Sequence, residues 1–239
     1  MDTDIVSLCE QFPAAPRYLS QVYLILRENE PVVGARISER LHVTPSSVTQ
    51  TLKRLEQHGL LSREPSRGYT LTATGERLAK HYISRHYLLE RLLVDELGVA
   101  WDIADDEAER LQMVLSTTLE HHIAKRLGHP DTCPHGNPFP GSEREAYLLH
   151  APTLTDSAAG DRVRVIRVTE EGEAVDGLLR FCYEHRLMLG SVLAIGTRNS
   201  TVLHARFGDD DIDIPLDFAR HMRVEPATRS RAAEPDAAS

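Results

Sequence analysis

Apolar residues recur at helical spacing in three short runs near the start of the chain. This spacing predicts helices over residues 17–28, 33–41 and 45–58. The third run opens at Thr44 and Pro45, a typical helix start, because the hydroxyl caps the first turn and proline has no N–H to leave unpaired there. Gly59 follows this run and is a typical residue after a helix end.

The residues after Gly59 show the pattern of a hairpin. Residues 60–63 and 69–72 are expected to form two short strands, separated by a turn rich in Pro, Ser and Gly. Three helices followed by a hairpin is the order of a winged helix-turn-helix domain. We therefore interpret residues 1–74 as a DNA-binding domain of this type.

Two longer helical patterns and then a strand pattern follow. Helices are predicted over 74–98 and 105–127, and their apolar faces suit a dimer interface. From residue 162, Val and Ile alternate with polar residues, which is typical of a small β-barrel. The sequence predicts a mainly α protein with a small β part, divided into a winged helix domain (1–74), a helical dimerisation domain (75–144), a linker (145–160), a β-barrel domain (161–226) and a disordered tail (227–239).

Charge is distributed unevenly along the chain. The net charge is −9, which argues against a surface that attracts nucleic acid everywhere. Between residues 34 and 69, however, six basic and three acidic residues give +3, and the rest of the chain carries −12. A small basic module on an acidic body is typical of a DNA-binding regulator.

Composition excludes several classes of protein. No apolar run approaches the length of a bilayer span, and the N-terminus lacks the basic and apolar parts of a secretion signal. Three widely spaced cysteines do not predict a disulfide framework. We therefore expect a cytoplasmic protein without a membrane partner. It is not expected to be an enzyme, because the sequence has no phosphate-binding loop and no nucleophile motif.

The predicted third helix carries the main functional pattern. Its polar face combines small hydroxyls, which allow close approach to the major groove, with Gln50, which can read an adenine edge. Basic residues follow for the phosphates. The expected DNA contacts are Arg36, Thr44, Pro45, Ser46, Ser47, Thr49, Gln50, Lys53, Arg54 and Arg67. The alternatives are a solvated helix face, or a scaffold whose winged helix binds protein.

Two pairs of possible metal ligands have helical spacing. His86 and Glu90 share one helix face, and Asp105 and Glu109 share another. If these faces meet, one imidazole and three carboxylates converge, a set that suits Mn²⁺ or Fe²⁺ better than Zn²⁺ or Cu²⁺. The alternative is that these are ordinary charged residues on solvated helix surfaces.

The chain resembles the diphtheria-toxin-repressor-like family of metal-dependent regulators from about residue 17 to 226. The segments that carry the resemblance are ARISERL (35–41), PSSVTQTL (45–52), LTATG (71–75), RHYLLERLL (85–93), DEAERL (106–111) and CPHGNPFPG (133–141). The resemblance implies a winged helix domain, a helical metal-binding and dimerisation domain and a C-terminal SH3-like (FeoA-like) barrel. It also implies a homodimer whose binding to a palindromic operator is promoted by Fe²⁺ or Mn²⁺, and control of metal homeostasis genes.

The family's ligand positions are only partly retained. His86, Glu90 and Glu109 match ligand positions, and Asp105 stands where many members have His. Ligands of the usual activating site are replaced by Arg17, Gln112 and Met113. Glu173 and Asp176 lie near barrel positions that complete the other site in some members.

The departures leave three outcomes open. The chain binds metal at one remodelled site, or it represses without metal because Arg17 serves as a built-in cation, or it responds to another effector. Cys133 and His135 suggest zinc, but two residues fall short of the usual four ligands. We therefore interpret that segment as a structured linker.

Overall fold

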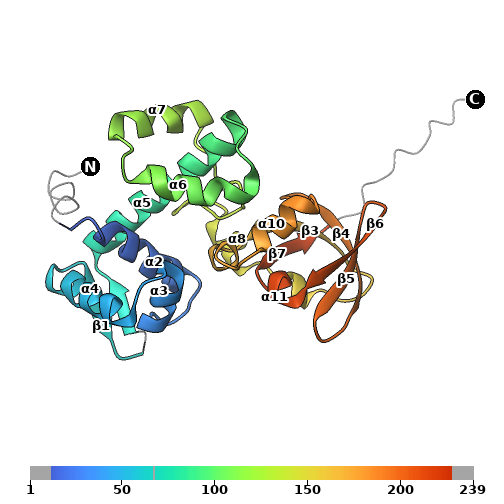
Figure 1. The fold of residues 1–239 in the computed structure, drawn as a ribbon, viewed down its shortest axis with the longest axis horizontal. Coiled ribbons are helices and arrows are strands. Elements are labelled where there is room, and N and C mark those ends of the chain that lie inside the picture. The colour runs from blue at the N-terminus through green and yellow to red at the C-terminus, as the bar shows by residue number, and fades with distance from the viewer. Residues whose placement is uncertain (1–11, 67, 228–239) are drawn as a thin grey trace, which may run out of the picture. The chain divides into compact units, whose positions relative to one another are not determined.

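The computed structural model describes residues 12–66 and 68–227 (Figure 1). The fold divides into two compact units between Leu149 and His150, and each is described separately below. None of the helices in the described ranges combines the length and apolar character that a bilayer span requires.

The first unit begins with the predicted winged helix domain. Its elements are α2 (Ala15–Arg27), α3 (Gly34–Leu41), α4 (Pro45–Gln57), β1 (Leu61–Glu64) and β2 (Gly68–Leu71). The strands pair antiparallel with Leu61 opposite Leu71. As expected, the Thr44 side chain caps α4 by accepting from the Ser47 N–H at 3.3 Å. The apolar faces of the three helices meet in one core that includes Val22, Ile25, Ile37, Val48, Leu52 and Leu55.

A long helix joins this domain to a helical part. α5 (Ala73–Arg91) packs against α2, α6 (Ala104–Gln112) and α7 (Thr117–Leu127). Buried Arg85 on α5 ties the helices together, because its Nη2 lies 2.8 Å from Glu120 Oε2 on α7. α5 is followed by one π-helical turn, Leu92–Glu96, and a 3₁₀ turn, Trp101–Ile103, precedes α6.

The prediction of a single helix over 105–127 is wrong. α6 ends at Gln112 and α7 begins after Ser116, whose hydroxyl accepts from the Leu119 N–H at 3.2 Å. Serine at this position starts a new helix, because its side chain satisfies a backbone donor that otherwise has no partner. Periodicity alone did not detect the break, since apolar residues continue across it.

The remainder of the first unit is a loop and a short helix. Residues 133–138 are all buried, although they form no helix and no named strand. α8 (Glu145–His150) follows. The segment predicted as a linker, 145–160, thus contains α8 and a 3₁₀ turn, Leu154–Asp156, which is stabilised by a capping box of Thr153 and Asp156.

The second unit is a five-stranded antiparallel sheet with three short helices. The strand order is β6-β5-β4-β3-β7. The strands are β3 (Arg162–Val168), β4 (Val192–Arg198), β5 (Val202–Phe207), β6 (Asp210–Pro215) and β7 (Met222–Pro226). The helices are α9 (Glu170–Glu173), α10 (Leu178–Glu184) and α11 (Leu216–Ala219). The alternating pattern noted from residue 162 agrees with the presence of strands in this unit, whereas β7, in which Met222 and Val224 are buried, was not indicated separately.

Candidate metal centre and DNA-binding surface

The outer face of α4 is polar and exposed. Val48, Leu52 and Leu55 are buried, whereas the intervening side chains lie at the surface. The exposed residues are Ser46, Ser47, Thr49, Gln50, Lys53 and Arg54. This is the surface that a helix needs in order to enter a major groove. Arg67 lies outside the described residues, so its expected role stays a prediction.

The two other predicted arginines are already engaged. Arg36 Nη1 lies 3.0 Å from Glu30 Oε2. The Arg54 guanidinium lies over the Phe12 ring, 4.3 Å from its centroid. To contact a phosphate, either guanidinium group would have to leave its present partner or share itself between that partner and the phosphate. Lys53 is therefore the stronger candidate for a phosphate contact on this surface.

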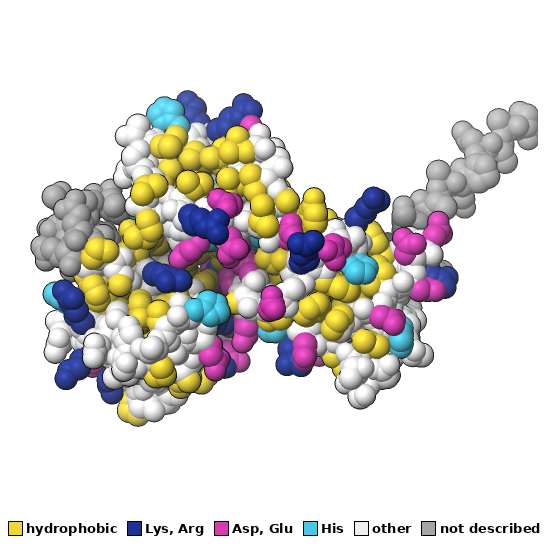
Figure 2. Space-filling view, viewed as in Figure 1, with side chains coloured by type: hydrophobic (Ala, Val, Ile, Leu, Met, Phe, Trp, Pro, Cys, Tyr) yellow, Lys and Arg dark blue, Asp and Glu magenta, His cyan; other side chains and the backbone are white. Residues whose placement is uncertain are grey.

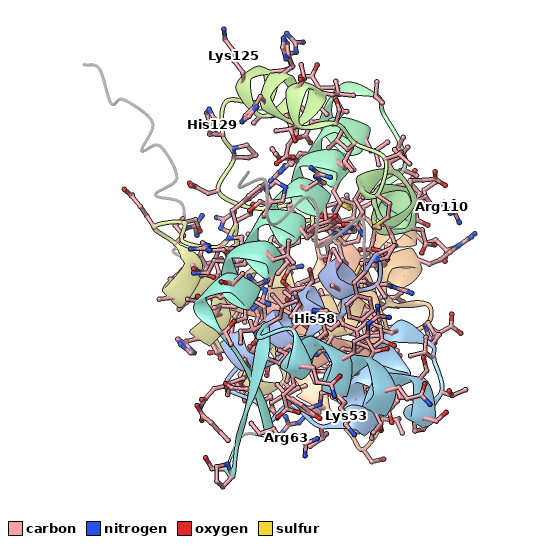
Figure 3. The ribbon with its side chains drawn as sticks, turned by 90° about the vertical axis from the view of Figure 1, so that its left-hand side faces the viewer. Lys53, His58, Arg63, Arg110, Lys125 and His129 are labelled. Carbon is pink, nitrogen blue, oxygen red and sulfur yellow. The ribbon has the colours of Figure 1, made fainter. Side chains whose placement is uncertain are left out.

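Arg63 on β1 is a further candidate that the sequence reasoning did not include. Its guanidinium lies over Tyr69 of β2, 4.7 Å from the ring centroid, and donates a hydrogen bond to the Tyr69 hydroxyl. Its Nε also lies 3.4 Å from Glu56 Oε2, so Arg63 is engaged in the same way as Arg36 and Arg54. Figure 3 shows Lys53 and Arg63 at the lower edge of the winged helix domain. Strand alternation would place Arg63 on the same face as buried Leu61, so this pattern gave no signal for Arg63, although the structure leaves it exposed.

His86, Glu90 and Asp105 converge as the helical spacing predicted. The His86 Nε2 atom lies 3.0 Å from Asp105 Oδ1 and 3.7 Å from Glu90 Oε1. α5 supplies His86 and Glu90 one turn apart, and the start of α6 supplies Asp105. One ligand atom from each residue lies within 4.8 Å of the others, close enough for a single cation to be held among them.

Cys133 and His135 approach the same carboxylate from the buried loop. His135 Nδ1 lies 3.1 Å from Glu90 Oε1 and 3.9 Å from Cys133 Sγ. Sequence reasoning set these residues aside because two ligands are too few. Their third partner, Glu90, is more than forty residues away in the sequence. Only the packing of the loop against α5 brings the three together.

The hydrogen bonds of His135 favour a cation at this point. Its Nε2 lies 3.0 Å from the Trp101 carbonyl oxygen, which can only accept, so Nε2 carries a proton. In the neutral ring, Nδ1 is then an acceptor, and it faces another acceptor in Glu90 Oε1. A proton or a metal ion is needed between them. In addition, Glu90 Oε2 is buried and has no hydrogen-bond partner among the described residues, so the carboxylate fits a metal ligand.

Electrostatics in this cluster favour charged side chains despite burial. Burial opposes protonation of His86, but its hydrogen bonds to Asp105 and Glu90 outweigh this, so the pKa of His86 lies well above its usual value. Burial also disfavours the Glu90 carboxylate, but His135 and His86 more than compensate, so the pKa of Glu90 lies below its usual value. A metal that binds His86 must therefore displace a proton.

Glu109 lies apart from both groups and is fully engaged. Arg17 Nε on α2 lies 3.1 Å from Glu109 Oε1, and the Gln112 amide donates to Glu109 Oε2. A guanidinium and an amide N–H offer no electron pair to a metal, and the guanidinium repels cations. Glu109 belongs to neither ligand group found among the described residues, so Arg17, Glu109 and Gln112 do not fit a metal site.

Glu173 and Asp176 belong to the second unit, where Glu173 ends α9. Their expected contribution to the metal site of the first unit stays a prediction.

Two family descriptions match the first unit. The one described as "Iron dependent repressor, N-terminal DNA binding domain" matches residues 13–69. The one described as "Iron dependent repressor, metal binding and dimerisation domain" matches residues 72–141. The second match covers α5, α6 and the loop 133–138, and therefore includes His86, Glu90, Asp105, Cys133 and His135.

Similar proteins cover nearly the whole chain. The diphtheria toxin repressor of Corynebacterium jeikeium is 40% identical, with 87% of this chain and 95% of that protein covered. The iron-dependent repressor IdeR of Mycobacterium tuberculosis is 32% identical over the same shares. A solved structure of a manganese-dependent transcriptional repressor in complex with manganese is 27% identical. It has a TM-score of 0.75 and covers 89% of this chain and 100% of that chain.

Proposed function

Because the chain belongs to the iron-dependent repressor family of metal-dependent transcriptional repressors, we propose that it binds a palindromic operator as a homodimer. Its affinity for the operator would be set by a divalent cation held at Glu90. The two α4 helices of such a dimer would enter successive major grooves about 34 Å apart. We place this activity in the cytoplasm, where the operator DNA lies.

An exposed apolar face supports the homodimer. Hydrophobic side chains gather over α6 and α7 in Figure 2. The large exposed ones in this part of the first unit are Leu97, Ile103, Leu111, Met113, Val114 and Leu119. A soluble protein rarely leaves so many neighbouring apolar residues uncovered unless they form an interface. A second copy of the chain would cover them.

The buried carboxylate of Glu90 is the observation that carries the metal proposal. It is fully buried, one of its oxygens has no partner among the described residues, and two histidines face the other. His86, Glu90 and Asp105 offer nitrogen and oxygen ligands, which suit Mn²⁺ or Fe²⁺. Cys133 and His135 add a thiolate and a second imidazole, a set that also accepts Zn²⁺.

A bound cation would supply positive charge that holds Glu90, Asp105 and the buried loop in one arrangement. His86 and Asp105 would fix the start of α6 relative to α5, and His135 would fix the loop relative to α5. Because α5 also packs against α2 of the winged helix domain, ordering these contacts would restrict how the two α4 helices are presented to DNA.

Operator binding in the presence and absence of metal tests the proposal. Fluorescence anisotropy of a labelled promoter fragment is measured in EDTA and then in Mn²⁺, Fe²⁺ and Zn²⁺ separately. We expect at least a tenfold rise in affinity with one of these ions, about 1.4 kcal/mol of coupling. Equal affinity in EDTA and in all three ions would contradict the metal response. Equal affinity for random DNA would contradict sequence-specific binding altogether.

The Arg17–Glu109 ion pair supports a second candidate, repression that does not need metal at this position. The guanidinium joins α2 to α6, so it holds the winged helix and helical parts together without an added cation. In this case the protein would retain substantial operator affinity in EDTA, and the metal would add to it.

Replacing Arg17 by methionine tests this contribution. Both side chains of the pair are nearly half exposed, so we expect a stability loss below about 1 kcal/mol and a two- to fivefold loss of operator affinity in EDTA, roughly the worth of one exposed ion pair. Arg110→Met is the matched control, since Arg110 on α6 pairs with Glu107 of the same helix. Equal effects of the two variants would show that the α2–α6 connection is irrelevant.

Two substitutions on α4 separate base recognition from phosphate binding. Gln50→Ala should relax base preference at one position, worth about 1–3 kcal/mol of discrimination. Lys53→Ala should weaken binding to all sequences alike and reduce the slope of log affinity against log salt by about one. Operator selection from a random library and a salt titration measure these effects. An unchanged selected sequence for Gln50→Ala would contradict its assignment.

A further inference from the structure

The buried loop, residues 132–139, connects the ligand cluster to the winged helix domain. Its backbone holds itself in a compact turn: the Cys133 N–H donates to the Asn137 carbonyl at 2.9 Å, and the Gly136 N–H donates to the Cys133 carbonyl at 3.0 Å. The Phe139 N–H closes the loop on the Asp131 carbonyl at 2.9 Å. A buried turn of this kind moves as one body, because its own hydrogen bonds oppose bending.

One end of the buried loop is fixed to α5 beside the ligands. Arg91 donates from Nε to the Thr132 carbonyl at 2.7 Å and from Nη2 to the Cys133 carbonyl at 3.1 Å. The Arg91 guanidinium therefore holds the backbone of one ligand residue, Cys133, while His135 contacts Glu90 two residues later. We call this the ligand end of the loop.

The other end contacts α2 through Arg27. Arg27 Nη1 donates to the Pro138 carbonyl at 3.1 Å, and Nη2 donates to the Tyr87 hydroxyl at 2.9 Å. The Arg27 side chain is only 5% exposed, so these contacts are made away from water, where they are strongest. The adjacent Phe139 ring packs edge-on against Tyr87, with 5.4 Å between centroids.

The α2 helix belongs to the DNA-binding domain, since it packs against both α3 and α4. Only two residues separate His135 at the ligand end from Pro138 at the α2 end. A displacement of the loop near Glu90 should therefore also displace the Pro138 carbonyl that accepts from Arg27, because the hydrogen bonds within this short turn oppose bending between its two ends.

We propose that the buried loop transmits metal occupancy at Glu90 to the DNA-binding helices, and that Arg27 is the positioning residue that receives it. This inference rests on the proposed metal-dependent function and adds the path by which metal binding reaches the DNA-binding helices. A cation held by Cys133 and His135 favours the arrangement in which the Pro138 carbonyl accepts from Arg27. By linkage, operator binding must then tighten metal binding by the same factor as metal tightens operator binding.

Arg27→Met tests the route, because methionine fills similar space without a hydrogen-bond donor. Operator affinity is measured in EDTA and in saturating Mn²⁺, and Mn²⁺ affinity is measured with and without operator. In the unchanged protein we expect both ratios to be tenfold or more. In Arg27→Met we expect both ratios to fall below twofold, while Mn²⁺ affinity without DNA stays within threefold.

Arg91→Met is the matched control at the ligand end. It removes the same kind of donor from α5, so we expect weaker Mn²⁺ binding but an undiminished ratio of operator affinities at saturating Mn²⁺. Thermal unfolding monitored by circular dichroism checks that each variant is folded. Tyr87→Phe, which removes one acceptor of Arg27, is a milder variant that should lower both ratios in part.

The outcomes separate this inference from the proposed function. A full response in Arg27→Met, or in Tyr87→Phe if Arg27→Met does not fold, would overturn the role of Arg27 while leaving the metal response intact. An unchanged protein that does not respond to Mn²⁺, Fe²⁺ or Zn²⁺ would overturn the proposed function and this inference together. Hydrogen exchange of α2 amides, slowed by Mn²⁺ in the unchanged protein and unaffected in Arg27→Met, would provide independent support.

Discussion

Replacing Glu90 by glutamine is expected to weaken Mn²⁺ binding by at least about a hundredfold and to remove the metal dependence of operator binding. Among the described residues, Glu90 is the ligand candidate that both groups share, so its substitution affects both. Glutamine keeps the volume of a fully buried side chain but removes the negative charge that a cation requires. Loss of even an indirect partner of a metal ligand typically costs ten- to about a hundredfold in affinity.

Isothermal titration with Mn²⁺ and operator binding with and without Mn²⁺ measure the two effects. Glu107→Gln is the matched control, because Glu107 is an acidic residue of α6 that forms an ion pair with Arg110 on the same helix. The control should bind Mn²⁺ and respond to it normally. Undiminished Mn²⁺ affinity in Glu90→Gln would place the metal elsewhere and contradict the proposed centre.

Replacing Val114 by glutamate is expected to convert the dimer to a monomer and to lower operator affinity by about a hundredfold or more. Val114 is 79% exposed in the single chain, so the substitution should change the stability of the monomer by no more than about 0.5 kcal/mol. In a dimer, two charges would meet at an apolar interface without partners. A monomer loses the second half-site contact, and this avidity is worth about 10²- to 10⁴-fold.

Sedimentation velocity gives the oligomeric state, and anisotropy with one and two half-sites gives the affinity. Tyr183→Glu is the control, since Tyr183 is a large exposed hydrophobic side chain on α10 of the second unit. It should leave both quantities unchanged. If Val114→Glu remains a dimer with full operator affinity, the α6–α7 face is not the interface.

Local sequence signals were sufficient for the winged helix domain. Apolar spacing and the Thr44 cap identify its helices, and the turn sequence identifies its hairpin. Each of these signals lies within a few residues of the element that it identifies. The same holds for His86 and Glu90, which one turn of helix brings together. Asp105 lies beside them because the segments of the two predicted helices, 74–98 and 105–127, pack against each other.

The parts that the sequence did not predict depend on contacts between distant residues. Cys133 and His135 became ligand candidates only because tertiary packing brings Glu90 beside them. The break before α7 depends on one serine hydroxyl that overrides a continuous apolar pattern. β7 has only five residues, and it is held by pairing with β3, more than fifty residues away in the sequence. Such a short segment carries little strand pattern of its own.

Arg17 differs from a metal ion in that it is tethered to the chain. Its local concentration beside Glu109 is fixed by the fold and does not fall when the cell is starved of iron or manganese. Under the second candidate proposed above, the α2–α6 contact would persist in starvation, and the metal-free protein would retain part of the DNA-binding arrangement. In terms of a two-state equilibrium, the metal-free population would already be shifted toward the DNA-binding form, so metal would convert fewer molecules to that form. Such a repressor would keep a baseline occupancy of its operators and would respond to metal over a narrower range.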